Sequence, residues 1–315
     1  MRNSERNMIN IENYFLKFLI IVFTLVIGGC KKAGNRPIND GAKTININGI
    51  NREFISYTPS TYNSTDAVPL MLNFHGWTMS ASDQMNVSDM RALAESEKFI
   101  IVYPQGTKFK NKFYGSTHWN VGSWTTGSIS DDIGFVEKLI DHMSVNYNID
   151  LERIYACGYS NGGFFSHELA CNLSNKIAAI GAVSANMSTQ TKDSCNPSHP
   201  IPVVTVSGTN DNKVSYDGTN FEGQISHNEV LNYWINYNQT DAFPIISDLP
   251  NINTTDGSSV KFYQYKNGNN NVEIEHYKVI NGGHDWPGTF GNMDIDANTI
   301  IWRFVSQFDI NGKIK

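Results

Sequence analysis

The sequence predicts an α/β fold in which helices cover both faces of a mostly parallel central sheet. Residues 70–74 and 99–103 are continuously apolar, as strands buried on both faces are. Amphipathic segments with helical spacing alternate with such strands along the chain. The chain has 315 residues, of which 40% are hydrophobic, so it can bury the core of one large domain.

The predicted elements follow this alternation from residue 43 to residue 308. The first two segments, 43–48 and 54–57, alternate as the strands of an antiparallel hairpin do. Further strands are expected at residues 70–74, 99–103, 153–157, 177–183, 203–207, 262–265 and 276–280. Helices are expected at residues 88–96, 131–147, 163–170 and 299–308. Asp131 and Asp132 should cap the second of these helices and interact with its dipole.

Residues 1–29 differ in composition from the rest and are predicted to be a lipoprotein signal peptide. Residues 18–27 are nearly all apolar and follow basic residues, but the run is too short to span a bilayer comfortably. Small residues directly before Cys30 resemble the bacterial lipoprotein cleavage box, which implies a lipid on Cys30. An uncleaved anchor helix is the alternative, and the chain could start at Met1 or at Met8. Residues 30–42 then form a tether before the domain of residues 43–315.

Residues 158–162, Gly-Tyr-Ser-Asn-Gly, lie between a predicted buried strand and a predicted helix. Glycines at the two ends of this pentapeptide suit a strained turn that leaves no room for side chains. A strand, Gly-x-Ser-x-Gly and a helix together form the nucleophile elbow of α/β-hydrolases. The sequence therefore predicts an α/β-hydrolase fold with Ser160 as the nucleophile.

A serine nucleophile needs a base and an orienting acid, and α/β-hydrolases place them after the serine in the order acid, then histidine. Asp211 follows the predicted strand 203–207, where site residues of parallel sheets gather. His284 lies on a glycine-flanked loop after the strand 276–280. These positions predict Asp211 as the acid and His284 as the general base.

Three other carboxylates after Ser160 need consideration as the acid. Asp217 and Asp256 compete with Asp211 for the role of the acid, although Asp217 is typical of a turn residue. Asp285 is a sequence neighbour of His284, and such neighbours seldom face each other across an imidazole ring. We therefore expect Asp285 to fix the loop.

Oxyanion stabilisation needs two preorganised N–H donors. Asn161 supplies one by its position after the nucleophile, and the Trp77 N–H in His-Gly-Trp is expected to supply the second. His75 is expected to be a hydrogen-bonded structural histidine, not a second base. Trp119 and Trp286 are candidates for substrate contact, with a place in the core as the alternative.

The motifs resemble the secreted esterases grouped with polyhydroxybutyrate depolymerases and feruloyl esterases. The resemblance spans roughly residues 45 to 308, and its most specific part is the block Gly-Gly-His-Asp-Trp-Pro-Gly around His284. The other matching segments are Pro-Leu-Met-Leu-Asn-Phe-His-Gly, Tyr-Pro-Gln-Gly, Asp-Asp-Ile-Gly-Phe, Gly-Tyr-Ser-Asn-Gly-Gly, Gly-Thr-Asn-Asp and Tyr-Asp-Gly.

The resemblance implies that residues 43–315 are a catalytic domain that hydrolyses carboxylic esters with Ser160, Asp211 and His284. Feruloyl or acetyl esters of plant polysaccharide are the favoured substrates, because a tethered cell-surface enzyme meets soluble glycan fragments more easily than insoluble granules. A hydroxyalkanoate polyester is the alternative. A peptidase and a non-catalytic carbohydrate-binding lipoprotein are the other classes considered.

Composition and cysteine placement add further expectations. A net charge of −6 leaves no broad basic surface, so no nucleic-acid partner is expected, and membrane contact should come through the lipid alone. The histidines are scattered, so no metal site is expected, and no glycine-rich phosphate loop is present, so no cofactor is expected. Export favours disulfides, and Cys171 and Cys195 are expected to form one, with two free thiols as the alternative. Cys157 is expected to be a buried thiol.

Overall fold

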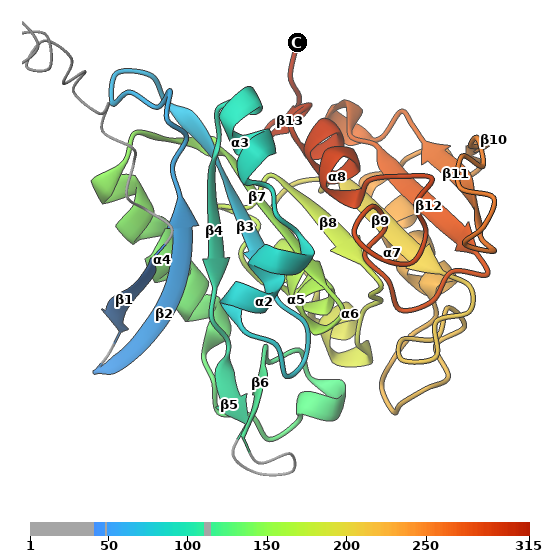
Figure 1. Ribbon diagram of the computed structural model, residues 1–315, viewed down its shortest axis with the longest axis horizontal. Helices are drawn as coiled ribbons and strands as arrows, with labels where there is room; N and C mark the ends of the chain where they lie inside the picture. The colour runs from blue at the N-terminus through green and yellow to red at the C-terminus, as the bar shows by residue number, and fades with distance from the viewer. Residues whose placement is uncertain (1–40, 48, 110–114) are drawn as a thin grey trace, which may run out of the picture. The chain divides into compact units, whose positions relative to one another are not determined.

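The computed structural model describes residues 41–47, 49–109 and 115–315. Ten strands of these residues form one central sheet (Figure 1). These residues belong to one compact unit, Asn39–Lys315. The predicted signal peptide, Cys30 and most of the predicted tether lie outside the described residues. The strand order is β1 (Ala42–Ile47), β2 (Ile50–Tyr57), β4 (Ile100–Pro104), β3 (Val68–Phe74), β7 (Ile149–Tyr159), β8 (Ala179–Val183), β9 (Val203–Gly208), β12 (Ile274–Ile280), β11 (Ser259–Tyr265) and β10 (Ile245–Asp248).

The middle of the sheet, from β4 to β12, is parallel, and both margins are antiparallel. At one margin β1 and β2 form the predicted hairpin, with Ile47 opposite Ile50. At the other margin β12, β11 and β10 pair antiparallel. Parallel strands have their carboxyl ends at one edge, so the loops that leave β3, β7, β9 and β12 meet there. The predicted mostly parallel sheet is confirmed.

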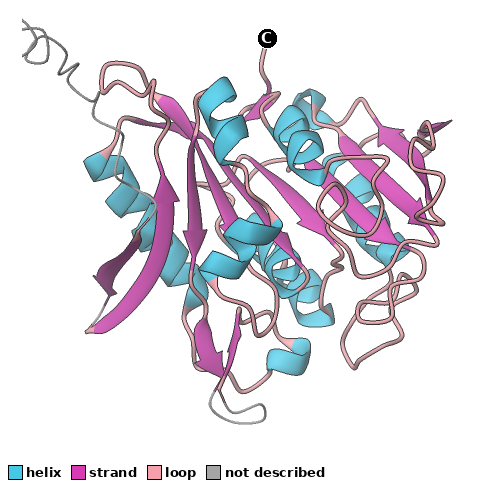
Figure 2. Cartoon of the chain, in the orientation of Figure 1, coloured by secondary structure: helices cyan, strands magenta, loops and turns pink. Residues whose placement is uncertain are grey.

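Helices cover both faces of this sheet (Figures 1 and 2). One face carries α4 (Asp132–Asn146), α5 (Asn161–Asn172), α6 (Thr189–Ser194) and α7 (His227–Asn238). The opposite face carries α2 (Ala81–Val87), α3 (Arg91–Glu97) and α8 (Ala297–Val305). Among the described residues, no helix is both long enough and apolar enough to cross a bilayer.

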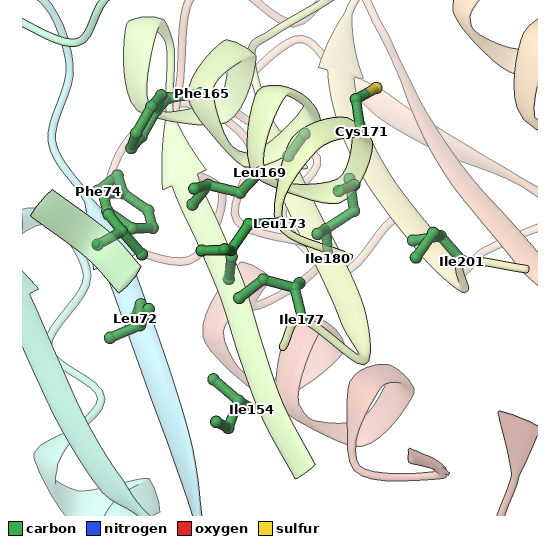
Figure 3. Packing of buried hydrophobic residues seen from close by; sticks show 14 of the residues in the cluster. Leu72, Phe74, Ile154, Phe165, Leu169, Cys171, Leu173, Ile177, Ile180 and Ile201 are labelled. Atoms are coloured by element: carbon green, nitrogen blue, oxygen red, sulfur yellow. The ribbon is translucent and has the colours of Figure 1, made fainter. Parts of the chain in front are cut away.

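Alternating side chains of β3 supply both cores. Leu72 and Phe74 are fully buried on the α5 face, where Phe165 and Leu169 pack over them (Figure 3). Met71 points to the opposite face and belongs to the second core. A strand buried on both faces explains why β3 reads as a continuous apolar run.

Several elements were not predicted from the sequence. They are α2, α6, α7, β10, β5 (Thr107–Phe109), β6 (Ser116–His118), η1 (Ser123–Thr125), η2 (Asn269–Asn271), β13 (Phe308–Asp309) and β14 (Gly312–Lys313). Most are too short to show a periodicity, but α7 carries buried residues at helical spacing, namely Val230, Leu231, Trp234 and Ile235. Polar residues among and beside them, including Asn228, Asn232 and Asn236, obscured that pattern.

Cys171 and Cys195 form a disulfide that joins α5 to the end of α6. Cys157 is a buried free thiol, and burial raises its pKa, so the thiol stays protonated. The cysteine arrangement is therefore the one expected from the sequence. Because α5 begins at the elbow, the disulfide fastens α6 to the helix that carries the nucleophile turn.

Replacing both Cys171 and Cys195 by alanine should lower the free energy of unfolding by about 3 kcal/mol, because the open chain gains loop entropy when it unfolds. Urea unfolding followed by circular dichroism measures the change. Reductant should lower the free energy of unfolding of the wild-type protein by a similar amount. Equal midpoints for the variant and the oxidised wild type would contradict a stabilising role for this bond.

Candidate active site

Ser160 sits on a strained turn between the end of β7 and the start of α5. Its φ is 53° and its ψ is −120°, a conformation that side-chain-bearing residues rarely adopt. A Cβ on Gly162 would lie 2.1 Å from the carbonyl oxygen of Phe74, and one on Gly158 would lie 2.4 Å from the backbone of Gly162. The two glycines therefore let β7, α5 and the end of β3 approach closely enough to form the elbow.

Asp211 and His284 meet on loops that leave two adjacent parallel strands, β9 and β12. The Nδ1 of His284 lies 2.7 Å from Oδ2 of Asp211, a hydrogen bond in which the imidazole N–H donates. Oδ1 of Asp211 accepts the backbone N–H groups of Lys213 and Val214, each at 2.8 Å. This buried carboxylate thus orients His284 with Nε2 left to accept a proton.

The competing carboxylates have other partners or lie in solvent. Asp217 is exposed, and Asp256 accepts hydrogen bonds from Ser258 and from the Met293 N–H. Asp285 accepts the Gly283 N–H at 2.8 Å, which fits the loop-fixing role expected for it. Only Asp211, of the carboxylates considered from the sequence, binds the His284 ring in the described structure.

A pocket of about 570 Å³ joins Ser160 and His284. Its apolar wall comes from the loop after β3, from η1 and from the loop after Asp211. The residues of this wall are Trp77, Met79, Trp124, Val214 and Phe221. Trp124 and Phe221 contact each other edge to face, with ring centroids 4.5 Å apart. Neither aromatic was a predicted site residue. Trp124 did carry a usable signal, because the segment Gly-Ser-Trp-Thr-Thr-Gly is polar and flanked by glycines, as surface loops with functional residues are.

Trp119 and Trp286 do not line this pocket, and their predicted contact with substrate is corrected to a packing role. Both side chains are fully buried. The Trp119 ring stacks on Phe165 at 5.0 Å, and its indole N–H donates to the carbonyl of His75 at 3.0 Å. The indole N–H of Trp286 donates to the side chain of Asn298 at 3.1 Å. A sequence motif marks residues near a site, but it does not say which way an indole ring points.

The predicted oxyanion donors lie on two segments that are linked through Trp119. Asn161 is the first residue of α5, where backbone N–H groups have no intrahelical acceptor, and Trp77 lines the pocket. The Asn161 side chain accepts the Trp119 N–H at 2.7 Å and donates to the Trp119 carbonyl at 3.1 Å. Together with the indole bond to His75, these contacts connect the elbow to the loop that carries Trp77.

His75 is a buried structural residue, as expected. Its Nε2 accepts the Gly106 N–H at 2.9 Å, so Nδ1 carries the proton and donates to the Gly76 carbonyl at 2.7 Å. Burial lowers the pKa of His75 to about 4, which keeps the ring neutral at ordinary pH. The neutral ring holds the loop between β3 and Trp77 in one conformation, as preorganised oxyanion donors require.

A serine on a strand-to-helix elbow above a parallel sheet is the feature that marks an α/β-hydrolase, and a histidine bound to a buried carboxylate lines the same pocket as this serine. Within the described part of the chain, no group of three or more histidine, cysteine or acidic side chains could hold a metal ion.

Comparison with known proteins places the chain among esterase relatives. The family model "Esterase PHB depolymerase" matches residues 53–199. A bifunctional acetylxylan esterase/xylanase from Neocallimastix patriciarum is 29% identical over 278 residues, which cover 86% of this chain and 36% of that protein. Feruloyl esterase B from Piromyces equi is 28% identical over 264 residues, which cover 82% of this chain and 46% of that protein. The chain is therefore a relative of the esterases that its motifs resemble, and it spans less than half the length of either protein.

Solved structures confirm the α/β-hydrolase fold. An acetyl xylan esterase from Aspergillus awamori superposes with a TM-score of 0.57 at 14% identity, covering 84% of this chain and 99% of that one. A feruloyl esterase module from Clostridium thermocellum, complexed with sinapinate, superposes with a TM-score of 0.54 at 11% identity and covers 84% of this chain and 88% of that one. At these identities the likeness concerns the fold alone.

Proposed function

We propose that the protein is a serine esterase that hydrolyses carboxylic esters through an acyl-enzyme. The observation that carries the proposal is the 2.7 Å bond from the buried Asp211 to His284, a residue that lines the same pocket as Ser160. A serine hydroxyl attacks an ester only with a base beside it, and an imidazole acts as that base only in the right tautomer. Asp211 supports that tautomer.

In the proposed reaction the Ser160 oxygen attacks the ester carbonyl carbon while Nε2 of His284 takes the hydroxyl proton. The Trp77 and Asn161 N–H groups stabilise the negative oxygen of the tetrahedral intermediate. When the ester C–O bond breaks, His284 returns the proton to the leaving alcohol. Water then attacks the acyl-enzyme by the same route, and the carboxylic acid is released.

Feruloyl or acetyl esters of plant polysaccharide are the substrates we propose. The support comes from the relatives, whose names include acetylxylan esterase and feruloyl esterase, and from the aromatic pocket wall at Trp77, Trp124 and Phe221. Flat rings of this kind stack on phenolic acids and on sugars. A hydroxyalkanoate polyester is the second candidate, favoured by the name of the matching family model. A non-catalytic carbohydrate-binding protein is the rival from another class.

Rates on methyl ferulate, acetylated xylan and a soluble hydroxybutyrate oligomer, measured side by side, test both the activity and the substrate. We expect hydrolysis of at least one polysaccharide-type ester at a higher kcat/KM than that of the oligomer. A fluorophosphonate probe should also label the folded protein, and peptide mapping should place the label on Ser160. Faster cleavage of the oligomer would reverse the substrate order, and failure of both labelling and hydrolysis would favour the non-catalytic rival.

We also propose that the protein is exported and anchored in a bacterial membrane by lipid on Cys30. The support is the short apolar stretch at residues 18–27 and the small residues directly before the cysteine. Mass spectrometry of the N-terminus from a membrane fraction should find an acylated Cys30. An unmodified full-length chain in the cytoplasm would contradict this location.

A further inference from the structure

Lys213 is a cationic side chain in the wall of the pocket that holds Ser160 and His284. It is exposed and follows Asp211 by two residues on the loop that leaves β9. Apart from His284, the other side chains that line the pocket are apolar or neutral. A residue with a positively charged side chain therefore lines a mainly apolar, aromatic pocket.

The backbone of Lys213 is fixed relative to the proposed base. Oδ1 of Asp211 accepts the Lys213 N–H at 2.8 Å, and Oδ2 of the same carboxylate binds His284 at 2.7 Å. A single buried group thus holds both the loop that carries the ammonium and the imidazole. The backbone of Lys213 is therefore fixed, while its flexible four-carbon side chain lets the charged end adjust to a ligand.

The Lys213 ammonium has no carboxylate partner among the described residues. Asp217 and Glu222, the acidic residues next along the loop, are exposed, and none of the lysine ion pairs among the described residues joins either of them to Lys213. The chain as a whole carries a net charge of −6, so the positive charge at this pocket is a local departure from the overall balance. A cation beside apolar walls attracts an anion more strongly than one surrounded by bulk water does.

We propose that Lys213 recognises a carboxylate carried by the ester substrate. The inference rests on the proposed esterase function and names a substrate class for the same site. The carboxylate could belong to the alcohol part, as on a uronic acid of an esterified glycan, or to the acyl part, as in the half-ester of a dicarboxylic acid. Both share one chemistry, which is an ester with a negative charge close to the scissile bond.

Two matched substrate pairs test the proposal and separate these sources. On the alcohol side, para-acetoxybenzoate is compared with para-acetoxybenzamide. On the acyl side, the mono-para-nitrophenyl ester of adipic acid is compared with the same ester of adipamic acid. For each pair the measured quantity is the ratio of kcat/KM for the charged ester to that for the neutral one.

Lys213→Gln should lower this ratio about five- to tenfold for one pair, the size expected of a partly exposed charge-assisted contact. Salt at about 0.5 M should reduce the wild-type ratio, because it screens exposed charges. The matched control is Lys138→Gln, which removes the same charge from the exposed side of α4 and should leave both ratios unchanged. The pair that responds identifies the part of the ester that bears the carboxylate.

Binding gives a second measurement that does not depend on turnover. In a Ser160→Ala background, calorimetry should show tighter binding of para-acetoxybenzoate or the adipate half-ester than of its neutral amide, and Lys213→Gln should remove the difference. Equal ratios in the wild type and the Lys213→Gln variant, in both rates and binding, would overturn the proposal. Absence of ester hydrolysis by the wild-type protein, with charge-dependent binding still observed, would instead count against the esterase function alone.

Discussion

Ser160→Ala should lower kcat for a short aryl ester by at least about 10⁴-fold, because removal of a nucleophile leaves only the binding and oxyanion contributions. The substitution deletes one oxygen from a half-buried position, so the elbow should keep its fold. Alanine has the same Cβ as serine and can occupy the same strained backbone conformation at φ 53° at no greater steric cost.

Initial rates at saturating ester measure the change, with circular dichroism and thermal unfolding to show that the variant is folded. Ser96→Ala is the matched control, since Ser96 is an exposed serine at the end of α3, on the sheet face opposite α5. It should retain activity within about twofold of the wild type, as remote surface substitutions usually do. A folded Ser160→Ala protein with wild-type turnover would show that another group is the nucleophile.

The elbow was predictable because its signal is local. Gly158, Ser160 and Gly162 carry the steric requirement of the turn within five residues, and the flanking strand and helix show their own periodicities. Asp211 and His284 were predictable for a different reason. Parallel strands bring their carboxyl ends to one edge, so residues far apart in the sequence converge once the strands are recognised.

The pocket wall was less predictable because it depends on side-chain direction and on loop contacts. Trp119 was a candidate for substrate contact with a core position as the alternative, and its indole turns inward to bind the His75 carbonyl. Trp124 and Phe221 come from segments almost a hundred residues apart in the sequence. A hydrogen bond from the Ser123 hydroxyl to the Glu222 carbonyl joins these two segments, and the Ser123 N–H donates to Gln190 of α6. No periodicity in the sequence reports such loop-to-loop contacts.

Asp211→Asn should lower kcat near neutral pH by about 10⁴-fold while the protein stays folded, by analogy with loss of the acid in other triads. The side-chain carbonyl oxygen of the introduced asparagine could still accept the N–H groups of Lys213 and Val214, so the loop should hold its shape. The amide nitrogen would then face Nδ1 of His284. Since that nitrogen can only donate, Nδ1 must accept, and the imidazole proton moves to Nε2. A protonated Nε2 cannot take the Ser160 proton.

Asp217→Asn is the matched control, because it makes the same change on the same loop at an exposed residue with no contact to His284. Its kcat should stay within about threefold of the wild type, as expected for a surface substitution. The comparison needs kcat for ester hydrolysis at several pH values and the unfolding midpoints of both variants. If Asp217→Asn lost activity and Asp211→Asn kept it, Asp217 would be the acid, and the His284–Asp211 bond would be structural only. If Asp211→Asn lost activity because it unfolded, its midpoint would fall with its rate. The tautomer argument requires the rate to fall alone.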